Sequence, residues 1–134
     1  MVFALPSVAR SECVTVPVDV RRAFQHADAV FSGTLVQIER DDTLTFRADR
    51  IWKGPSSHEI VVFQLGRPFV GSFVFRRGTR YLIFANLVGQ EDRKLGGIPD
   101  GPAFGIPQSC GSEPWPLDLV PQLDKIARSQ KPRH

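Results

Sequence analysis

The stretch that decides the fold is residues 30–53, VFSGTLVQIERDDTLTFRADRIWK, which has the pattern of two long strands joined by a short turn. In residues 43–53 apolar and polar side chains alternate, as in an antiparallel strand with one buried face. In residues 30–40 the apolar side chains change from one face of the strand to the other next to Gly33. This predicts a bulge or sharp coil in a closing sheet. The aspartates at 41–42 suit a tight hairpin turn.

Further strands are predicted downstream of this hairpin. Residues 59–65 (EIVVFQL) and 80–86 (RYLIFAN) are apolar on both faces, so we expect both to be covered on both sides. Residues 87–107 lack such a pattern and are predicted to form a loop, with at most one short strand near residues 94–96. About five strands in hairpin-like succession favour a sandwich or a small barrel. The bulged first strand favours the five-stranded, partly open barrel of the OB type.

A helix is predicted at each end of the barrel. Residues 17–28 (PVDVRRAFQHAD) and 117–128 (LDLVPQLDKIAR) place apolar side chains on one helical face. The expected fold is therefore mainly β, an OB-fold-like five-stranded barrel with an N-terminal and a C-terminal helix. We expect a leader or residual signal-peptide segment at residues 1–12, one domain at 13–129 and a disordered basic tail at 130–134.

Composition limits the classes of function. Hydrophobic residues make up 42% and charged residues 23% of 134 residues, which is the profile of a soluble globular domain. The net charge of +3 is compatible with anionic partners but too small to require them. No apolar run approaches the ~18 residues that span a bilayer. Residues 1–9 end in a small-x-small pattern but lack a basic n-region, so a residual signal peptide and a short leader or first strand both remain open.

The chemistry-bearing residues predict no catalytic or metal site. His26, His58 and His134 are scattered without metal-ligand spacing, and we interpret them as solvated. Adjacent carboxylates in predicted loops lack the opposed geometry of a catalytic pair, and no phosphate loop or dinucleotide fingerprint is present. Cys13 and Cys110 are compatible with one disulfide or with two free thiols. We therefore expect no enzyme activity, no metal and no cofactor.

Basic side chains form one grouping of interest around the predicted strands. On an OB barrel, strand-face cations interleaved with aromatic rings would bind single-stranded nucleic acid. The alternative is that these cations keep a Phe-rich barrel soluble and pair with acidic neighbours such as Asp49, and the low net charge favours this alternative. The possible anion-binding residues are Arg47, Arg76, Arg77 and Arg80.

Residues 96–109 (GGIPDGPAFGIPQS) form a long, proline-stiffened segment that carries Phe104 and Ile106. No predicted strand or helix accounts for these two side chains, and long loops in compact domains are commonly functional. We expect Phe104 and Ile106, together with Phe69 and Phe73, to contribute to a partner-binding surface. The alternative is that Phe104 plugs one end of the barrel.

Several segments resemble one known family. Residues 27–36 (ADAVFSGTLV) resemble the first helix-to-strand junction of bacterial netrin-like domains, which are relatives of the tissue inhibitors of metalloproteinases. Residues 46–54 (FRADRIWKG) resemble the second strand of that family, and residues 75–85 (FRRGTRYLIFA) resemble its glycine turn and following strand. Residues 110–112 (CGS) and 116–117 match the region where the last cysteine of the family precedes the terminal helix.

The resemblance implies an OB-like barrel in an exported protein that is periplasmic, on the cell surface or secreted. It also implies a Cys13–Cys110 disulfide, because the further cysteine that family members carry before the glycine turn is missing here. In the metalloproteinase inhibitors an N-terminal cysteine chelates the zinc of the target, which Cys13 can do only after cleavage behind Glu12. We therefore expect a monomeric, non-enzymatic protein-interaction module whose partner is an unknown protein. A metalloproteinase inhibitor and a single-stranded nucleic-acid-binding protein remain alternatives.

Overall fold

The computed structural model describes residues 19–40, 43–65, 73–89, 103–107 and 114–129. The helices and strands in these ranges follow the order α1 (Val20–His26), β1 (Ala29–Glu39), β2 (Thr43–Lys53), β3 (Glu59–Leu65), β4 (Arg80–Leu87), β5 (Phe104–Pro107), the 3-10 turn η2 (Leu117–Leu119) and α3 (Val120–Ser129).

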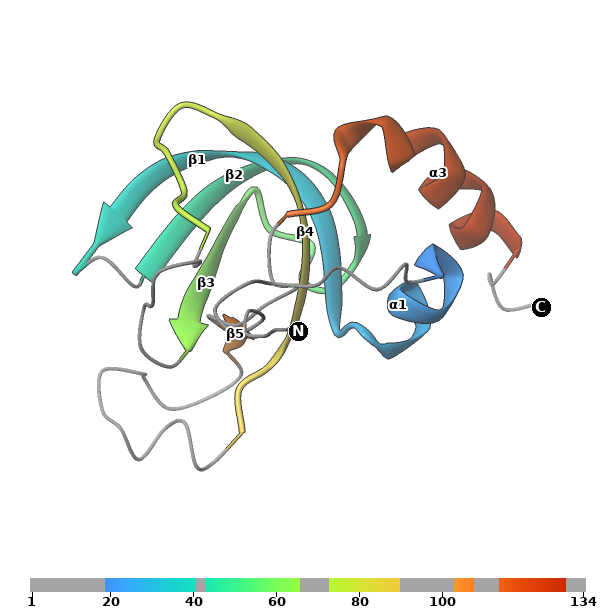
Figure 1. The fold of residues 1–134 in the computed structure, drawn as a ribbon, viewed down its shortest axis with the longest axis horizontal. Helices are drawn as coiled ribbons and strands as arrows, with labels where there is room; N and C mark the ends of the chain where they lie inside the picture. Colours follow the sequence, from blue (N-terminus) through green and yellow to red (C-terminus); the bar gives the residue numbers. More distant parts are fainter. Residues whose placement is uncertain (1–18, 41–42, 66–72, 90–102, 108–113, 130–134) are drawn as a thin grey trace, which may run out of the picture.

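The strands close into a barrel in the order β1-β2-β3-β5-β4, with both helices on one side of it (Figure 1). Strand β1 pairs antiparallel with β2 on one side and with β4 on the other, and these two pairings close the ring. Strands β3 and β5 pair in parallel. The predicted five-stranded β-barrel with a helix at each end is thus confirmed, and its ring of strand pairs is closed rather than partly open.

The predicted irregularity next to Gly33 is also confirmed. The pairing of β1 with β2 shifts register between Ser32 and Gly33, as well as at two other places. A side chain at residue 33 would place its Cβ only 2.6 Å from the carbonyl oxygen of Arg47, so the two backbones cross here at a separation that only glycine permits. The shifts bend β1, so that its first half pairs with β4 while the strand pairs with β2 along nearly its whole length.

One strand was missed in the sequence. The segment predicted to be a loop contains β5, which pairs in parallel with β3 and in antiparallel fashion with β4. The strands therefore do not follow one another in hairpin-like succession, since a short segment far along the chain completes the ring. The strand predicted near residues 94–96 lies outside the described residues.

Two apolar clusters hold the domain together. Inside the barrel, the Phe46 ring contacts the rings of Phe31, Phe75 and Tyr81 edge-on, with centroids 5.5–6.3 Å apart. The second cluster lies between the helices and the outer side of β1 and β4, and its buried residues are Val20, Phe24, Ala27, Val30, Leu82, Leu123 and Ile126. Strands β1 and β4 are therefore covered on both faces at the helical side of the barrel.

Helix α1 is short and is held at both ends. Asp19 caps α1 by accepting a hydrogen bond from the backbone N–H of Arg21 at 3.0 Å. At the other end, Lys53 Nζ donates to the carbonyl oxygens of Phe24 and Ala27, each at 2.8 Å, so a strand residue caps the helix. In the described part of the chain, no helix has the length and apolar character needed to cross a membrane.

Candidate functional site

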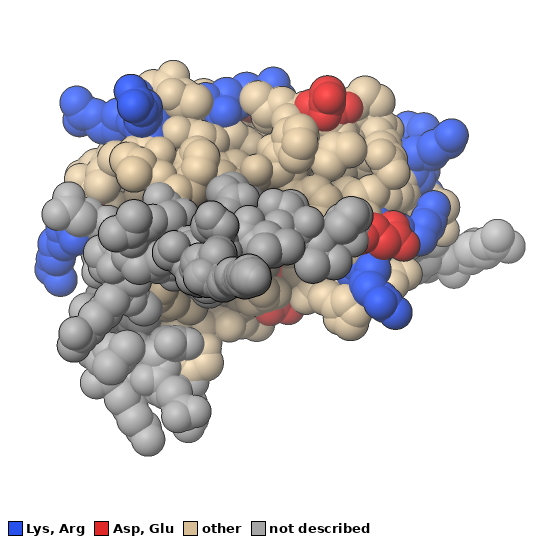
Figure 2. Space-filling view, in the orientation of Figure 1, with Lys and Arg blue, Asp and Glu red and all other residues tan. Residues whose placement is uncertain are grey.

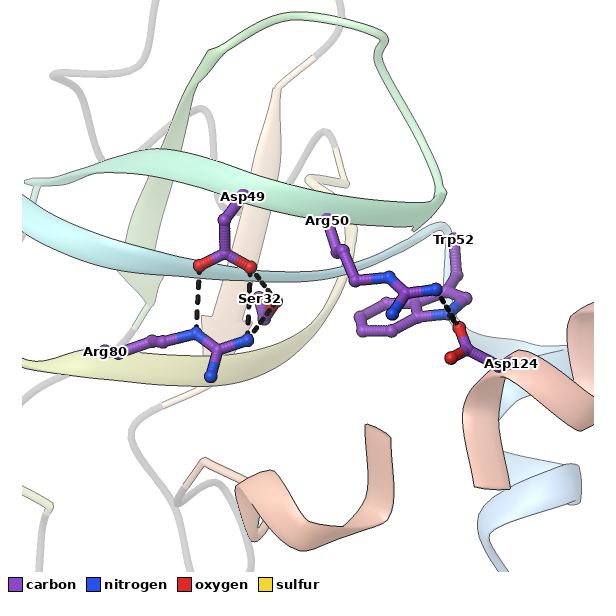
Figure 3. Close-up of polar contacts among 6 residues, drawn as sticks. All are labelled: Ser32, Asp49, Arg50, Trp52, Arg80 and Asp124. Atoms are coloured by element: carbon purple, nitrogen blue, oxygen red, sulfur yellow. Dashed lines mark hydrogen bonds and ion pairs between the residues drawn. The ribbon is translucent and has the colours of Figure 1, made fainter. Parts of the chain in front are cut away.

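The first polar cluster links three strands on the outside of the barrel and consists of Ser32 from β1, Asp49 from β2 and Arg80 from β4 (Figure 3). The Ser32 hydroxyl donates to Asp49 Oδ1 at 2.5 Å. The Arg80 guanidinium donates to both carboxylate oxygens of Asp49, at 2.9 Å from Nε and 3.2 Å from Nη2. Ser32 is the one fully buried polar residue in the described ranges, and these contacts satisfy its hydroxyl.

The charge state of Asp49 follows from these contacts. Burial raises the pKa of Asp49, but the hydrogen bonds from Arg80 and Ser32 and the charges of Arg80 and Arg50 outweigh it, so the pKa lies below its ordinary value of 3.8. Asp49 is therefore ionised at neutral pH, whereas a general acid or base needs a pKa near the working pH. The cluster holds Arg80 in place and is not suited to proton transfer.

The second polar cluster attaches α3 to the end of β2 and consists of Arg50, Trp52 and Asp124 (Figure 3). Asp124 Oδ1 accepts a hydrogen bond from the Trp52 indole N–H at 2.8 Å and an ion-paired hydrogen bond from Arg50 at 2.5 Å. The Arg50 guanidinium also lies over the Trp52 ring, 5.4 Å from its centroid. These contacts fix the indole and the guanidinium relative to each other and to the helix.

A surface hollow of about 280 Å³ opens beside this second cluster, between β2 and α3. Its walls combine apolar side chains with charged ones: Arg50, Ile51, Trp52, Asp124, Ala127 and Arg128. Arg128 is exposed and has no hydrogen bond or ion pair with another described residue. Sequence reasoning missed this site because it depends on where α3 meets β2.

The structure brings two of the four predicted anion-binding arginines together. Thr34 of β1 lies opposite Arg47 on one side and opposite Arg80 on the other, so the two arginines share one face of neighbouring strands. Arg76 and Arg77 lie in the segment that precedes β4. Figure 2 shows basic side chains along the upper left edge of the molecule, and in Figure 1 this edge is formed by β1 and the segment leading into β4. Arg80 is neutralised by Asp49, which confirms the predicted pairing of this cation with an acidic neighbour.

The predicted partner-binding aromatic and aliphatic residues are mostly built into the barrel. Phe104 and Ile106 belong to β5, so the premise that no strand accounts for them is wrong. Ile106 is buried in the barrel core and its side chain is not presented at the surface, while Phe104 is half-buried and packs against that core. Phe73 is half-buried and its ring lies 4.9 Å from that of Phe75. Phe69 lies outside the described residues.

The histidines and cysteines are the remaining candidate site residues. His26 and His58 are exposed, as predicted, while Cys13, Cys110 and His134 lie outside the described residues. Within the described ranges, no three His, Cys, Asp or Glu side chains come close enough together to hold a metal ion.

One apolar side chain on β3 lies at the surface against expectation. The flanking Ile60 and Val62 are buried, but Val61 is 40% exposed, so the prediction that this strand is covered on both faces is wrong. The helices pack against β1, β4 and the end of β2, so no helix of the described residues covers the outer face of β2 and β3 (Figure 1). Thr45 lies opposite Val61 on that face.

Comparison with known proteins adds no relative, because no family model and no curated protein matches this chain. The likeness to netrin-like domains therefore rests on the sequence segments quoted above.

Proposed function

We propose that this protein is a non-enzymatic interaction module of the netrin-like, OB-barrel type, and that it binds a protein partner through the outer face of β2 and β3. The observation that carries the proposal is the exposure of Val61 in the middle of this face. Contiguous apolar side chains exposed within a polar rim mark interaction sites.

The composition of the face supports a small interface. Register places Thr45 opposite Val61 and Thr43 opposite the half-buried Phe63, so an apolar strip is bordered by threonines. Arg47 and Glu59 lie opposite each other at the end of the strip and supply a charged edge. An apolar centre with a polar rim is the usual anatomy of a protein interface.

A protein partner is favoured over single-stranded nucleic acid by the kind of apolar side chain exposed. Nucleic-acid bases stack on exposed aromatic rings. The large apolar side chains that are exposed among the described residues are all aliphatic: Ile51, Val61, Val74 and Leu87. Aliphatic side chains offer no stacking platform, and the Phe63 ring in the strip is half-buried, so the basic residues near this face act as an interface rim in this proposal.

An exported location and a Cys13–Cys110 disulfide belong to the same proposal and are supported by the family resemblance. Intact-mass measurement of the protein from its native host, with and without reductant, tests both points. A full-length chain with two free thiols contradicts them.

Site-specific photocrosslinking tests the proposed face. A photoreactive amino acid at position 61 is compared with one at Gln122, an exposed residue of α3 on another part of the surface. In extracts of the native host, position 61 should give a discrete light-dependent adduct that excess wild-type protein suppresses and excess Val61→Lys protein does not. Equal adducts from both positions, or none from position 61, contradict the proposal.

A further inference from the structure

We propose that the hollow between β2 and α3 is a binding site for a carboxylate of a partner protein and the aliphatic carbons attached to it, with Arg128 as the group that binds the carboxylate. The inference rests on the proposed function in taking the carboxylate to belong to a protein, but it concerns a different surface from the β2–β3 face.

The apolar part of the hollow is held in a fixed position. The Trp52 indole is anchored through its N–H to Asp124 and is packed beneath the Arg50 guanidinium. Ile51 presents 36% of its surface to solvent beside this ring, and the half-buried Ala127 forms the wall on α3. A ligand therefore meets a preformed apolar wall, and little ordering of side chains is needed on binding.

The charge balance of the hollow favours an anion. Arg50 and Asp124 form an ion pair and offset each other, which leaves the positive charge of Arg128 without a counter-charge among the described residues. A guanidinium presents paired N–H donors whose geometry matches a carboxylate. A phosphate monoester has up to two charges and three strongly accepting oxygens, which the Arg128 guanidinium does not satisfy when Arg50 is paired with Asp124.

The size of the hollow favours a single residue over a metabolite. Its volume of about 280 Å³ lies just below the roughly 300–1,000 Å³ of small-molecule sites. Protein interfaces, in contrast, draw much of their affinity from a few anchor side chains that fill small pockets. The carboxylate can come from an acidic side chain or from a chain terminus, and the same guanidinium binds either.

Nuclear magnetic resonance of the tryptophan side chains tests the proposal on the full chain. The probes are N-acetyl-leucine, with a terminal carboxylate, N-acetyl-glutamic acid α-amide, with a side-chain carboxylate, and the neutral N-acetyl-leucinamide. At least one acid should shift the Trp52 indole N–H signal saturably at millimolar concentration, and the neutral amide should not. The signal of Trp115, which stacks on Phe84 outside the hollow, should stay in place. The acid that binds more tightly identifies the source of the carboxylate.

Two variants with the same change in net charge complete the test. Arg128→Gln should weaken binding of the acid about tenfold or more, because a charge-assisted hydrogen bond is lost. Lys125→Gln removes a cation from the same helix, at an exposed position that does not line the hollow, and should leave the affinity unchanged. Both side chains are exposed, so we expect both variants to fold.

Three outcomes overturn the inference: no probe shifts the Trp52 signal, the neutral amide binds as well as the acids, or the two variants weaken binding equally. If position 61 still crosslinks to a partner in any of these cases, the proposed function stands and only the hollow is excluded. If the acids bind as expected but position 61 gives no adduct, the β2–β3 face is excluded instead.

Discussion

Replacing Gly33 by alanine should destabilise the barrel. The new Cβ would lie 2.6 Å from the Arg47 carbonyl oxygen, 2.9 Å from Ala48 Cα and 3.0 Å from the Arg47 carbonyl carbon. All three are backbone atoms, so no side-chain rotation relieves the contact. The strands must separate by about 0.8 Å to reach an ordinary contact distance of 3.4 Å.

The magnitude follows from the opposing effects. Overpacking a close-packed interior costs about 1–3 kcal/mol. A weakened strand hydrogen bond adds about 1 kcal/mol. The lower conformational entropy of alanine in the unfolded chain returns about 0.4–1 kcal/mol. We therefore expect Gly33→Ala to lower the free energy of unfolding by about 1–3.5 kcal/mol, a substantial part of the roughly 5–15 kcal/mol of a natural domain.

Urea unfolding followed by far-UV circular dichroism measures this loss, and Gly89→Ala is the matched control. A Cβ at residue 89 meets no atom within 4 Å, so this variant should stay within about 0.5 kcal/mol of the wild type. The midpoint for Gly33→Ala should fall with an unchanged slope of the transition, because the folded state remains native-like. If the two variants prove equally stable, the close approach of the two backbones is not a constraint on this position.

Three further predictions test other parts of the structure. Phe46→Ala removes a fully buried ring and should lower the free energy of unfolding by about 3–5 kcal/mol; a loss below 1 kcal/mol in calorimetry contradicts the ring cluster. Asp49 has a lowered pKa in the fold, so its stabilisation is present above its unfolded value of 3.8 and is lost as pH falls through the folded value. The stability difference between wild type and Asp49→Asn should therefore shrink below about pH 4 in acid titrations, and a difference constant with pH argues against the Arg80 contact. Lys53→Met removes the donors to the end of α1, so hydrogen exchange should quicken in Val20–His26 more than in the barrel strands, and a uniform change contradicts the cap.

The β1–β2 hairpin was predictable because its signal is local. Alternation over residues 43–53 and the phase change next to Gly33 are both read from neighbouring residues, and the structure has the strand and the register shift. Strand β5 was not predictable in the same way. It has four residues, including a glycine and a proline, and it exists because β3 and β4 provide pairing partners on both sides.

The candidate sites likewise combine features that neighbouring residues predict with contacts that only the folded chain creates. The sequence predicts Asp49 as an acidic partner for the basic side chains, although the choice of Arg80 and the contact with the buried Ser32 depend on β4 lying beside β1. The hollow was invisible, because Trp52 and Asp124 are 72 positions apart in the chain and meet only when α3 packs on β2. Likewise, the exposure of Val61 depends on which side of the barrel the helices cover.

The Lys53 cap has a consequence for how the chain folds during synthesis. A helix as short as Val20–His26 is not stable alone in water, and its last carbonyl oxygens find their donor 29 residues later in the chain. At translation rates of about 5–20 residues per second, that lysine follows Phe24 by roughly one to six seconds. Helix α1 should therefore be among the last elements to become ordered, after the end of β2 is in place. A ribosome-bound fragment that ends before Lys53 should contain no protected helix, whereas one extended through β4 and α3 should.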